Sequence, residues 1–275
     1  MPSLGDVPKA LPKTMAISLS VRIGGQLSKT AYKMNRIFQL TALLLLLLTS
    51  CTTSNSKSDL LQNENKQIVF DKTPNSKTES LRKIIEQIVS DKNAVVGVSL
   101  IGNNGIDTLS LNGDKRFPMQ SVFKFHIALA VLSEVDKGTL SLDQTVEIGK
   151  DELLPENFWS PLRDENPNGG IFTIKRLIQY NVSYSDNTAC DVLIQLIGTP
   201  KTVESYLKKS GIEDIQLIFN EEEMQEKWEN MFQNWTTPNA ASQTLKLFFE
   251  NKNNLLSKSS YDFFWKTNTD TKTAG

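Results

Sequence analysis

Ser121 and Lys124 combine a hydroxyl nucleophile with a lysine three residues later, at the start of an apolar run that continues to Leu132. On an α-helix, residues at this spacing lie on one face. The run is apolar on every side of such a helix, which predicts burial in a core. A buried lysine is costly unless it is paired or neutral, and a lysine that readily loses its proton can accept one from a neighbouring serine. The pattern therefore predicts a serine nucleophile assisted by a lysine.

The composition excludes several other kinds of site. Of the 275 residues, 39% are hydrophobic and 22% charged, with a net charge of -1. These values are ordinary for a soluble globular protein and give no reason to expect a nucleic-acid partner. With one histidine and two cysteines, a zinc site with several such ligands cannot be assembled, so we predict no metal and no cofactor. A histidine-based triad would depend on His126 alone.

Hydrophobic patterns place the serine and lysine after a helix and a β-hairpin. The pattern over residues 81–89 predicts an amphipathic helix, and two apolar runs at 94–101 and 106–111 predict the hairpin. The helix that begins near Ser121 is expected to end at about Asp136. Later helical patterns cover residues 173–182, 189–197, 203–207, 237–249 and 259–266.

Few strands are predicted beyond the hairpin. Residues 145–148 indicate one short strand, and nothing else after Gly113 has a convincing strand pattern. Because two strands alone do not make a stable sheet, the hairpin needs partners that the sequence does not reveal.

The N-terminal part of the chain is typical of a targeting sequence. Residues 34–51 combine a short basic segment, an apolar run of about a dozen residues and Cys51, and they resemble a bacterial lipoprotein signal whose cysteine is lipidated. The run is too short to span a bilayer, which takes about 20 apolar residues. An uncleaved anchor and an ordinary signal with an incidental cysteine remain alternatives. Residues 1–33 are expected to be a misassigned upstream start, and residues 52–77 a polar tether.

Two further motifs follow the first along the chain. Ser185-Asp186-Asn187 lies in a break between two predicted helices, and an acidic segment begins at Glu221. The order and form of Ser-x-x-Lys and Ser-Asp-Asn resemble those of the serine β-lactamases of class A.

This resemblance covers residues 78–275 and implies an α+β, two-lobed β-lactamase/transpeptidase-like fold. Residues 78–118 would form the N-terminal part of an α/β lobe, whose antiparallel sheet is present only as the hairpin, and residues 119–266 an all-helical lobe. The sequences at 119–124 and 233–236 are similar to the extended-spectrum cephalosporinase branch of Bacteroides and its relatives.

The resemblance also implies a role for each motif residue. Ser121 would attack the β-lactam carbonyl, and its own backbone N–H would stabilise the developing oxyanion. Lys124 would share a proton with Ser121, and Ser185 would relay a proton to the leaving nitrogen. Asn187 would hold Lys124 and the amide of the substrate side chain. Glu221 would activate the water that releases the product, while the base for acylation, Lys124 or Glu221, stays open.

The choice of Glu221 over Glu222 and Glu223 rests on its position after an apolar segment and before Met224. The family's usual Arg-x-Glu-x-x-Leu-Asn segment is absent. Gln225 stands where an asparagine would usually hold the water, so the geometry of deacylation is expected to differ.

A third family motif, Lys-Thr/Ser-Gly on a strand, is not matched by Lys272-Thr273-Ala274-Gly275. The residues before it include no apolar side chain, which argues against a strand. We therefore expect an incomplete catalytic domain, inactive and poorly folded, whose hairpin keeps an unpaired apolar edge.

Other conspicuous residues have structural interpretations. His126 is expected in the core or at a lobe boundary, Cys190 as a small buried thiol, and Asp186 as a turn or helix-capping residue. The tryptophans are expected to pack the core: Trp159, Trp228, Trp235 and Trp265.

Two other functions share these features. A penicillin-binding transpeptidase or carboxypeptidase has the same Ser-x-x-Lys but deacylates slowly, and a non-enzymatic lipoprotein could keep the fold for binding. For the enzyme, we expect a β-lactam as substrate, a monomeric state, and a lipid anchor at Cys51 that holds the protein in the periplasm of a Gram-negative bacterium.

Overall fold

The computed structural model describes residues 13–16, 76–102 and 105–269. The predicted signal, Cys51, nearly all of the predicted tether and the Lys272 segment lie outside these residues.

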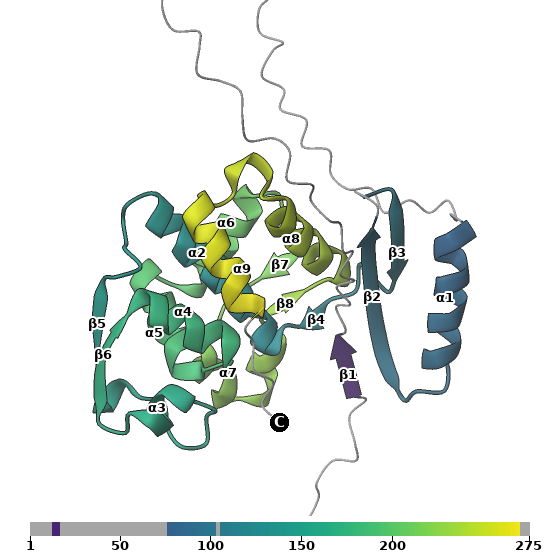
Figure 1. Cartoon of the computed structure of the whole chain (residues 1–275). Helices are drawn as coiled ribbons and strands as arrows, with labels where there is room; N and C mark the ends of the chain where they lie inside the picture. The colour runs from purple at the N-terminus through teal and green to yellow at the C-terminus, as the bar shows by residue number, and fades with distance from the viewer. Residues whose placement is uncertain (1–12, 17–75, 103–104, 270–275) are drawn as a thin grey trace, which may run out of the picture. The chain divides into compact units, whose positions relative to one another are not determined.

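The hairpin and the first helix form as predicted (Figure 1). α1 (Ser76–Val89) lies beside β3 (Asp107–Leu111), which pairs antiparallel with β2 (Ala94–Gly102). Among the described residues β3 has no second strand partner, so the predicted unpaired edge of the hairpin is found there. The other edge is paired, because β1 (Lys13–Ala16) pairs parallel with β2. A strand edge offers unpaired N–H and C=O groups to any extended segment, so four residues suffice to occupy it.

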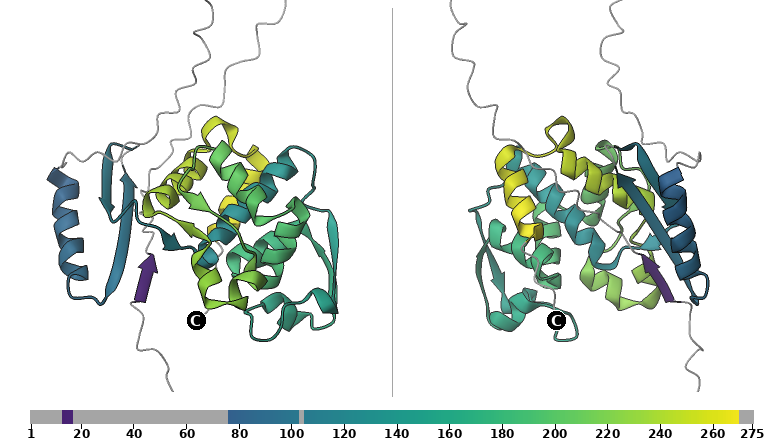
Figure 2. Two further views of the ribbon diagram at one scale, coloured as in Figure 1. Left: turned by 180° about the vertical axis from the view of Figure 1, so that it is seen from behind. Right: turned by 45° about the vertical axis from the view of Figure 1, so that its right-hand side comes forward.

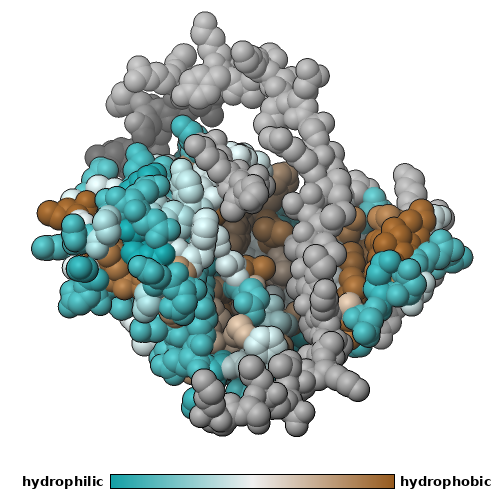
Figure 3. Space-filling model, turned by 90° about the horizontal axis from the view of Figure 1, so that it is seen from below, coloured by the Kyte–Doolittle hydropathy of each residue, from teal (hydrophilic) through white to brown (hydrophobic). Residues whose placement is uncertain are grey.

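The apolar stripe of α1 is only partly covered. Leu81, Ile84 and Ile88 are 37%, 52% and 60% exposed. Figure 3 shows apolar surface over this helix, at the right of the view.

β2 meets the segment that leads to Ser121 at Gly97. A Cβ atom at this position would lie 2.6 Å from both the Phe117 ring and Pro238 Cγ, a separation too short for carbon atoms. Glycine therefore allows this close approach, which joins β2 to the rest of the fold. α8 (Pro238–Glu250) covers β2, and Ser242 Oγ donates to the carbonyl of Ser99 at 3.2 Å.

α2 (Phe123–Asp136) is the centre of the helical core. Phe123, Ile127 and residues 129–132 are almost fully buried, which confirms the predicted buried helix and its end at Asp136. The helices that pack against it include α4 (Ile174–Ser183), α5 (Asn187–Ile197), α6 (Pro200–Lys209) and α9 (Lys258–Thr269) (Figures 1 and 2).

The expectation of no convincing strands after Gly113 is wrong. β4 (Phe117–Pro118), β8 (Trp235–Thr236) and β7 (Ile215–Gln216) form a small sheet in that order. Strands of two residues are too short to show an alternating pattern. A second hairpin joins β5 (Thr145–Gly149), near the short strand predicted there, to β6 (Gly169–Thr173).

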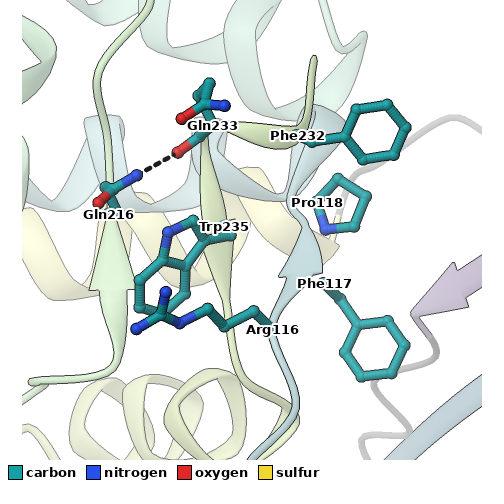
Figure 4. Close-up of a pocket in the computed structure, with 7 residues that line it drawn as sticks. All are labelled: Arg116, Phe117, Pro118, Gln216, Phe232, Gln233 and Trp235. Atoms are coloured by element: carbon teal, nitrogen blue, oxygen red, sulfur yellow. Dashed lines mark hydrogen bonds between the residues drawn. The ribbon is translucent and has the colours of Figure 1, made fainter. Parts of the chain in front are cut away.

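Side chains on the small sheet line a surface cavity of about 430 Å³ (Figure 4). The Arg116 guanidinium lies 4.0 Å from the centre of the Trp235 ring. Gln216 Nε2 donates to the carbonyl of Gln233 at 2.9 Å. The other lining residues are Phe117, Pro118 and Phe232.

Candidate active site

A tight turn presents Ser121 at the start of α2. Met119, which is buried, donates its N–H to the carbonyl of Asn234 at 2.9 Å. Gln120 then adopts a left-handed conformation with φ of 46°, which is unfavourable for a residue with a side chain and is often retained at functional sites. Ser121 is exposed in the 3-10 turn Gln120–Val122 that precedes α2.

Lys124 connects the predicted site residues. Its side chain is 3% exposed, and its Nζ donates to Ser121 Oγ at 3.1 Å and to Asn187 Oδ1 at 2.6 Å. A third donation, to Glu221 Oε1, forms a short buried ion pair. An ammonium has three protons to donate, so this geometry gives each proton an acceptor. Residues from three separate motifs are therefore brought to one point.

Only one of the three acidic candidates reaches this point. Glu221 is 5% exposed, whereas Glu222 and Glu223 are exposed. Glu221 begins α7 (Glu221–Glu226), and the side chain of Asn220 caps this helix by accepting the N–H of Glu223. The sequence-based choice of Glu221 agrees with this burial, while its chemical role stays a prediction.

Ser185 lies in the turn between α4 and α5, where it adopts a left-handed φ of 55°. It is half-buried, and its hydroxyl makes no hydrogen bond to another side chain of the described residues. The next residue, Asp186, accepts the N–H groups of Ala189 at 2.8 Å and Leu162 at 2.7 Å. The prediction that Asp186 caps the following helix is thus confirmed, and burial raises the pKa of its carboxyl.

The sequence analysis missed Asp191, which holds the backbone of the acidic segment. Asp191 Oδ1 accepts the N–H of Glu221 at 2.7 Å, and its Oδ2 accepts the N–H of Glu222 at 3.1 Å. Asp191 lies four residues after Asn187 on α5, so the two share a helix face. That spacing from the Ser-Asp-Asn motif was the available signal.

Asp191 is expected to make the free energy of unfolding depend on pH. Burial raises the pKa of its carboxyl from the usual 3.8 to about 7, although the two amides oppose this rise. Since the folded state holds the proton more tightly, this contribution to stability is complete below about pH 4 and is lost as the pH rises through 7. The loss amounts to about 4 kcal/mol, at about 1.4 kcal/mol per pH unit.

Urea unfolding between pH 4 and pH 8 measures this effect. The stability of the wild type relative to that of Asp191→Asn should increase by about 4 kcal/mol from pH 8 to pH 4, because only the wild-type side chain takes up a proton over this range. A constant difference across the range would contradict the assignment to Asp191.

The remaining predictions have mixed outcomes. His126 and Cys190 are buried, as expected; burial lowers the pKa of His126 to about 4 and raises that of the Cys190 thiol. The expected core packing is wrong for Trp159, Trp228 and Trp265, which are 53%, 56% and 38% exposed. The Trp159 indole N–H donates to the carbonyl of Tyr184 at 2.8 Å, beside Ser185, because an indole N–H needs an acceptor that an apolar core lacks.

No helix in the described part of the chain has the length and apolar content needed to cross a membrane. Within residues 13–16, 76–102 and 105–269, no group of three or more His, Cys, Asp and Glu side chains has the arrangement of a metal site.

Comparisons with known proteins agree with this geometry. A family model described as the β-lactamase enzyme family matches residues 80–274. β-Lactamase VEB-1 of Pseudomonas aeruginosa is 50% identical over 182 residues, which cover 66% of this chain and 60% of that protein. The chain therefore spans about 60% of the length of this curated relative.

Solved structures show the same similarity. The crystal structure of the TLA-1 extended-spectrum β-lactamase is 42% identical with a TM-score of 0.68, over 71% of this chain and 70% of that one. A class A β-lactamase from Bacteroides cellulosilyticus DSM 14838 is 35% identical with a TM-score of 0.66, over 74% of this chain and 71% of that one. The buried ammonium of Lys124, which contacts both Ser121 and Glu221, thus lies in a chain that belongs to the class A β-lactamase family.

Proposed function

We propose that this protein hydrolyses β-lactams through a covalent acyl-enzyme on Ser121. The observation that carries the proposal is the single buried ammonium of Lys124, which contacts Ser121, Asn187 and Glu221. A hydroxyl nucleophile becomes reactive when an adjacent group can accept its proton. Lys124 is close enough to Ser121 to accept this proton directly, and Glu221 is close enough to Lys124 to accept it by way of the lysine.

Acylation begins with attack of Ser121 Oγ on the lactam carbonyl carbon. The serine proton passes to the base, for which Lys124 and Glu221 remain the two candidates. The backbone N–H of Ser121, at the N-terminal end of α2, stabilises the negative charge on the carbonyl oxygen. The carbonyl–nitrogen bond then breaks, and the Ser185 hydroxyl relays a proton to the nitrogen.

Deacylation requires a water molecule activated by Glu221. Its carboxylate takes a proton from the water, whose oxygen attacks the ester carbonyl. The ester bond then breaks, and the proton is returned to Ser121 Oγ, which regenerates the hydroxyl and the carboxylate. Gln225, which stands where the family usually has asparagine, is exposed on α7. We therefore propose that the attacking water is held differently from that of the usual family member.

Finer aspects of the function extend this proposal. We propose penicillins and cephalosporins as substrates, which is supported by the similarity to an enzyme described as an extended-spectrum β-lactamase. The apolar run before Cys51 supports a lipid-anchored protein in the periplasm. A monomer is sufficient, because all the side chains that contact Lys124 come from one chain.

Labelling with a fluorescent penicillin tests the proposal. The wild type should acquire one label per chain, and Ser121→Ala should acquire none, because the ester cannot form without the hydroxyl. Ser90→Ala, which removes an exposed hydroxyl elsewhere, should label as the wild type does. Equal labelling of Ser121→Ala would refute the proposed nucleophile, and a label that is never released would favour the penicillin-binding alternative.

A further inference from the structure

The chain that leads into Glu221 is held by side chains rather than by a backbone ladder. From Leu217 to Glu223, every backbone N–H donates to a side-chain oxygen. Two of these bonds lie within the segment: the N–H of Asn220 donates to the side chain of Glu223, and the N–H of Glu223 donates to the side chain of Asn220. The acceptors from outside the segment are Glu204 for Leu217, Asn234 for Ile218 and Phe219, and Asp191 for Glu221 and Glu222.

Glu204 is the acceptor farthest from the reacting groups along this segment. It lies on α6, is 1% exposed, and accepts the N–H of Leu217 through Oε2 at 3.0 Å. Its other oxygen, Oε1, accepts from Lys201 Nζ at 2.6 Å and Lys208 Nζ at 2.8 Å. Burial alone would raise the pKa of Glu204, but the two lysines and the amide hold it below its usual value. The carboxylate is therefore charged at neutral pH.

The two oxygens of Glu204 face different partners. One is directed to the ammonium groups of α6, and the other to the backbone of the acidic segment. A buried glutamate is rare unless it is paired, and its neighbours on α6, Val203 and Leu207, are fully buried apolar residues. Packing alone would be satisfied by an apolar residue at this position, so the carboxylate is explained by its bond to Leu217.

We propose that Glu204 is a positioning residue for Glu221. By accepting the N–H of Leu217, it fixes the position of the backbone at the end of β7. Asn234 and Asp191 then fix the backbone of the following residues, up to Glu221 beside Lys124. The inference rests on the proposed function, because positioning matters only if Glu221 activates water. Loss of the anchor should affect deacylation most, since the contacts of Lys124 with Ser121 and Asn187 do not involve the segment.

Glu204→Gln provides the test, because it keeps the shape of the side chain and removes its charge. A carboxamide has one acceptor oxygen, so its NH₂ group must face either the lysines or the N–H of Leu217, which are all donors. Small displacements of a catalytic group can slow a reaction about 100-fold. We expect the deacylation rate for a chromogenic cephalosporin to fall about 10- to 100-fold, and the acylation rate to stay within about threefold.

Two controls accompany this variant in the full chain. Lys201→Gln removes one exposed partner of Glu204 and leaves the bond to Leu217 in place, and Glu213→Gln neutralises an exposed glutamate nearby in sequence. Both should deacylate within about threefold of the wild type. Equal slowing of acylation and deacylation by Glu204→Gln, or an unchanged deacylation rate, would overturn the inference. If Glu204→Gln does not fold, Glu204→Asp shortens the reach of the carboxylate and should show the same selective loss.

Hydrogen exchange separates this inference from the proposed function. In Glu204→Gln, a peptide that covers residues 217–223 should exchange at least about tenfold faster than in the wild type, while a peptide from α2 stays protected. Unchanged exchange at 217–223 would overturn the inference whatever the kinetics. A wild type that never forms an adduct would overturn the proposed function alone, and the exchange rates would still show whether Glu204 holds the segment.

Discussion

Glu221→Gln is expected to trap the protein as a stable adduct on Ser121. Glutamine keeps the size of the side chain but cannot accept a proton from water, so hydrolysis of the ester loses its general base. General base catalysis contributes about 10²- to 10⁴-fold, and the deacylation rate should fall by a factor in this range. Acylation should persist if Lys124 is the base. Mass spectrometry of the quenched reaction should then show a chain heavier by one substrate molecule.

Glu222→Gln is the matched control for this variant. It neutralises the adjacent carboxylate, which is exposed and does not contact Lys124. Turnover by Glu222→Gln should match that of the wild type, with no accumulated adduct. If Glu221→Gln instead turns over normally, Glu221 is not the deacylation base. If it forms no adduct at all, Glu221 is also required for acylation, and Lys124 is not sufficient as the base.

Lys124→Met should abolish acylation and destabilise the folded protein. Methionine fills the space but leaves Glu221, which is 5% exposed, without its ion-pair partner. Removing one member of a buried pair typically costs about 3–5 kcal/mol, because the other charge stays buried and uncompensated. The free energy of unfolding in urea should fall by this amount, and labelling by a fluorescent penicillin should disappear.

The double variant Lys124→Met/Glu221→Gln tests the cause of that loss. If the destabilisation comes from the orphaned carboxylate, removing its charge should restore most of the stability while the protein remains inactive. The two changes would then be strongly non-additive, as expected for residues in direct contact. Additive losses, or a Lys124→Met protein as stable as the wild type, would show that the ion pair does not contribute to stability in this way.

The longer elements of the fold were predictable, because they have a repeating pattern. The apolar spacing over residues 81–89 and the uniformly apolar α2 each indicated a helix, and both were confirmed. The strands β4, β7 and β8 have two residues each, which is too short for any alternation. They form because the tertiary structure brings three extended segments together, and no local pattern records that.

The residues that contact Lys124 were predictable from motif order, whereas those that support them were not. Asp191 and Glu204 are acids on amphipathic helices, where a carboxylate usually faces solvent. Their burial depends on which backbone N–H groups lie opposite, and those belong to a segment 13 to 31 residues away. The prediction for Trp159 failed in the other direction. A large aromatic residue usually packs in the core, but Trp159 is exposed beside the Ser185 turn.

The small sheet has a kinetic consequence for the site. β7 precedes Glu221 and β8 follows the same loop, so the two ends of the loop are paired with each other, and β8 is also paired with β4, the strand that leads to Ser121. If the loop opens locally, the carboxylate cannot diffuse away, and its effective concentration near Lys124 stays high. Because the entropy of closing a loop grows only slowly with its length, the ion pair can re-form after each opening without refolding of the lobe.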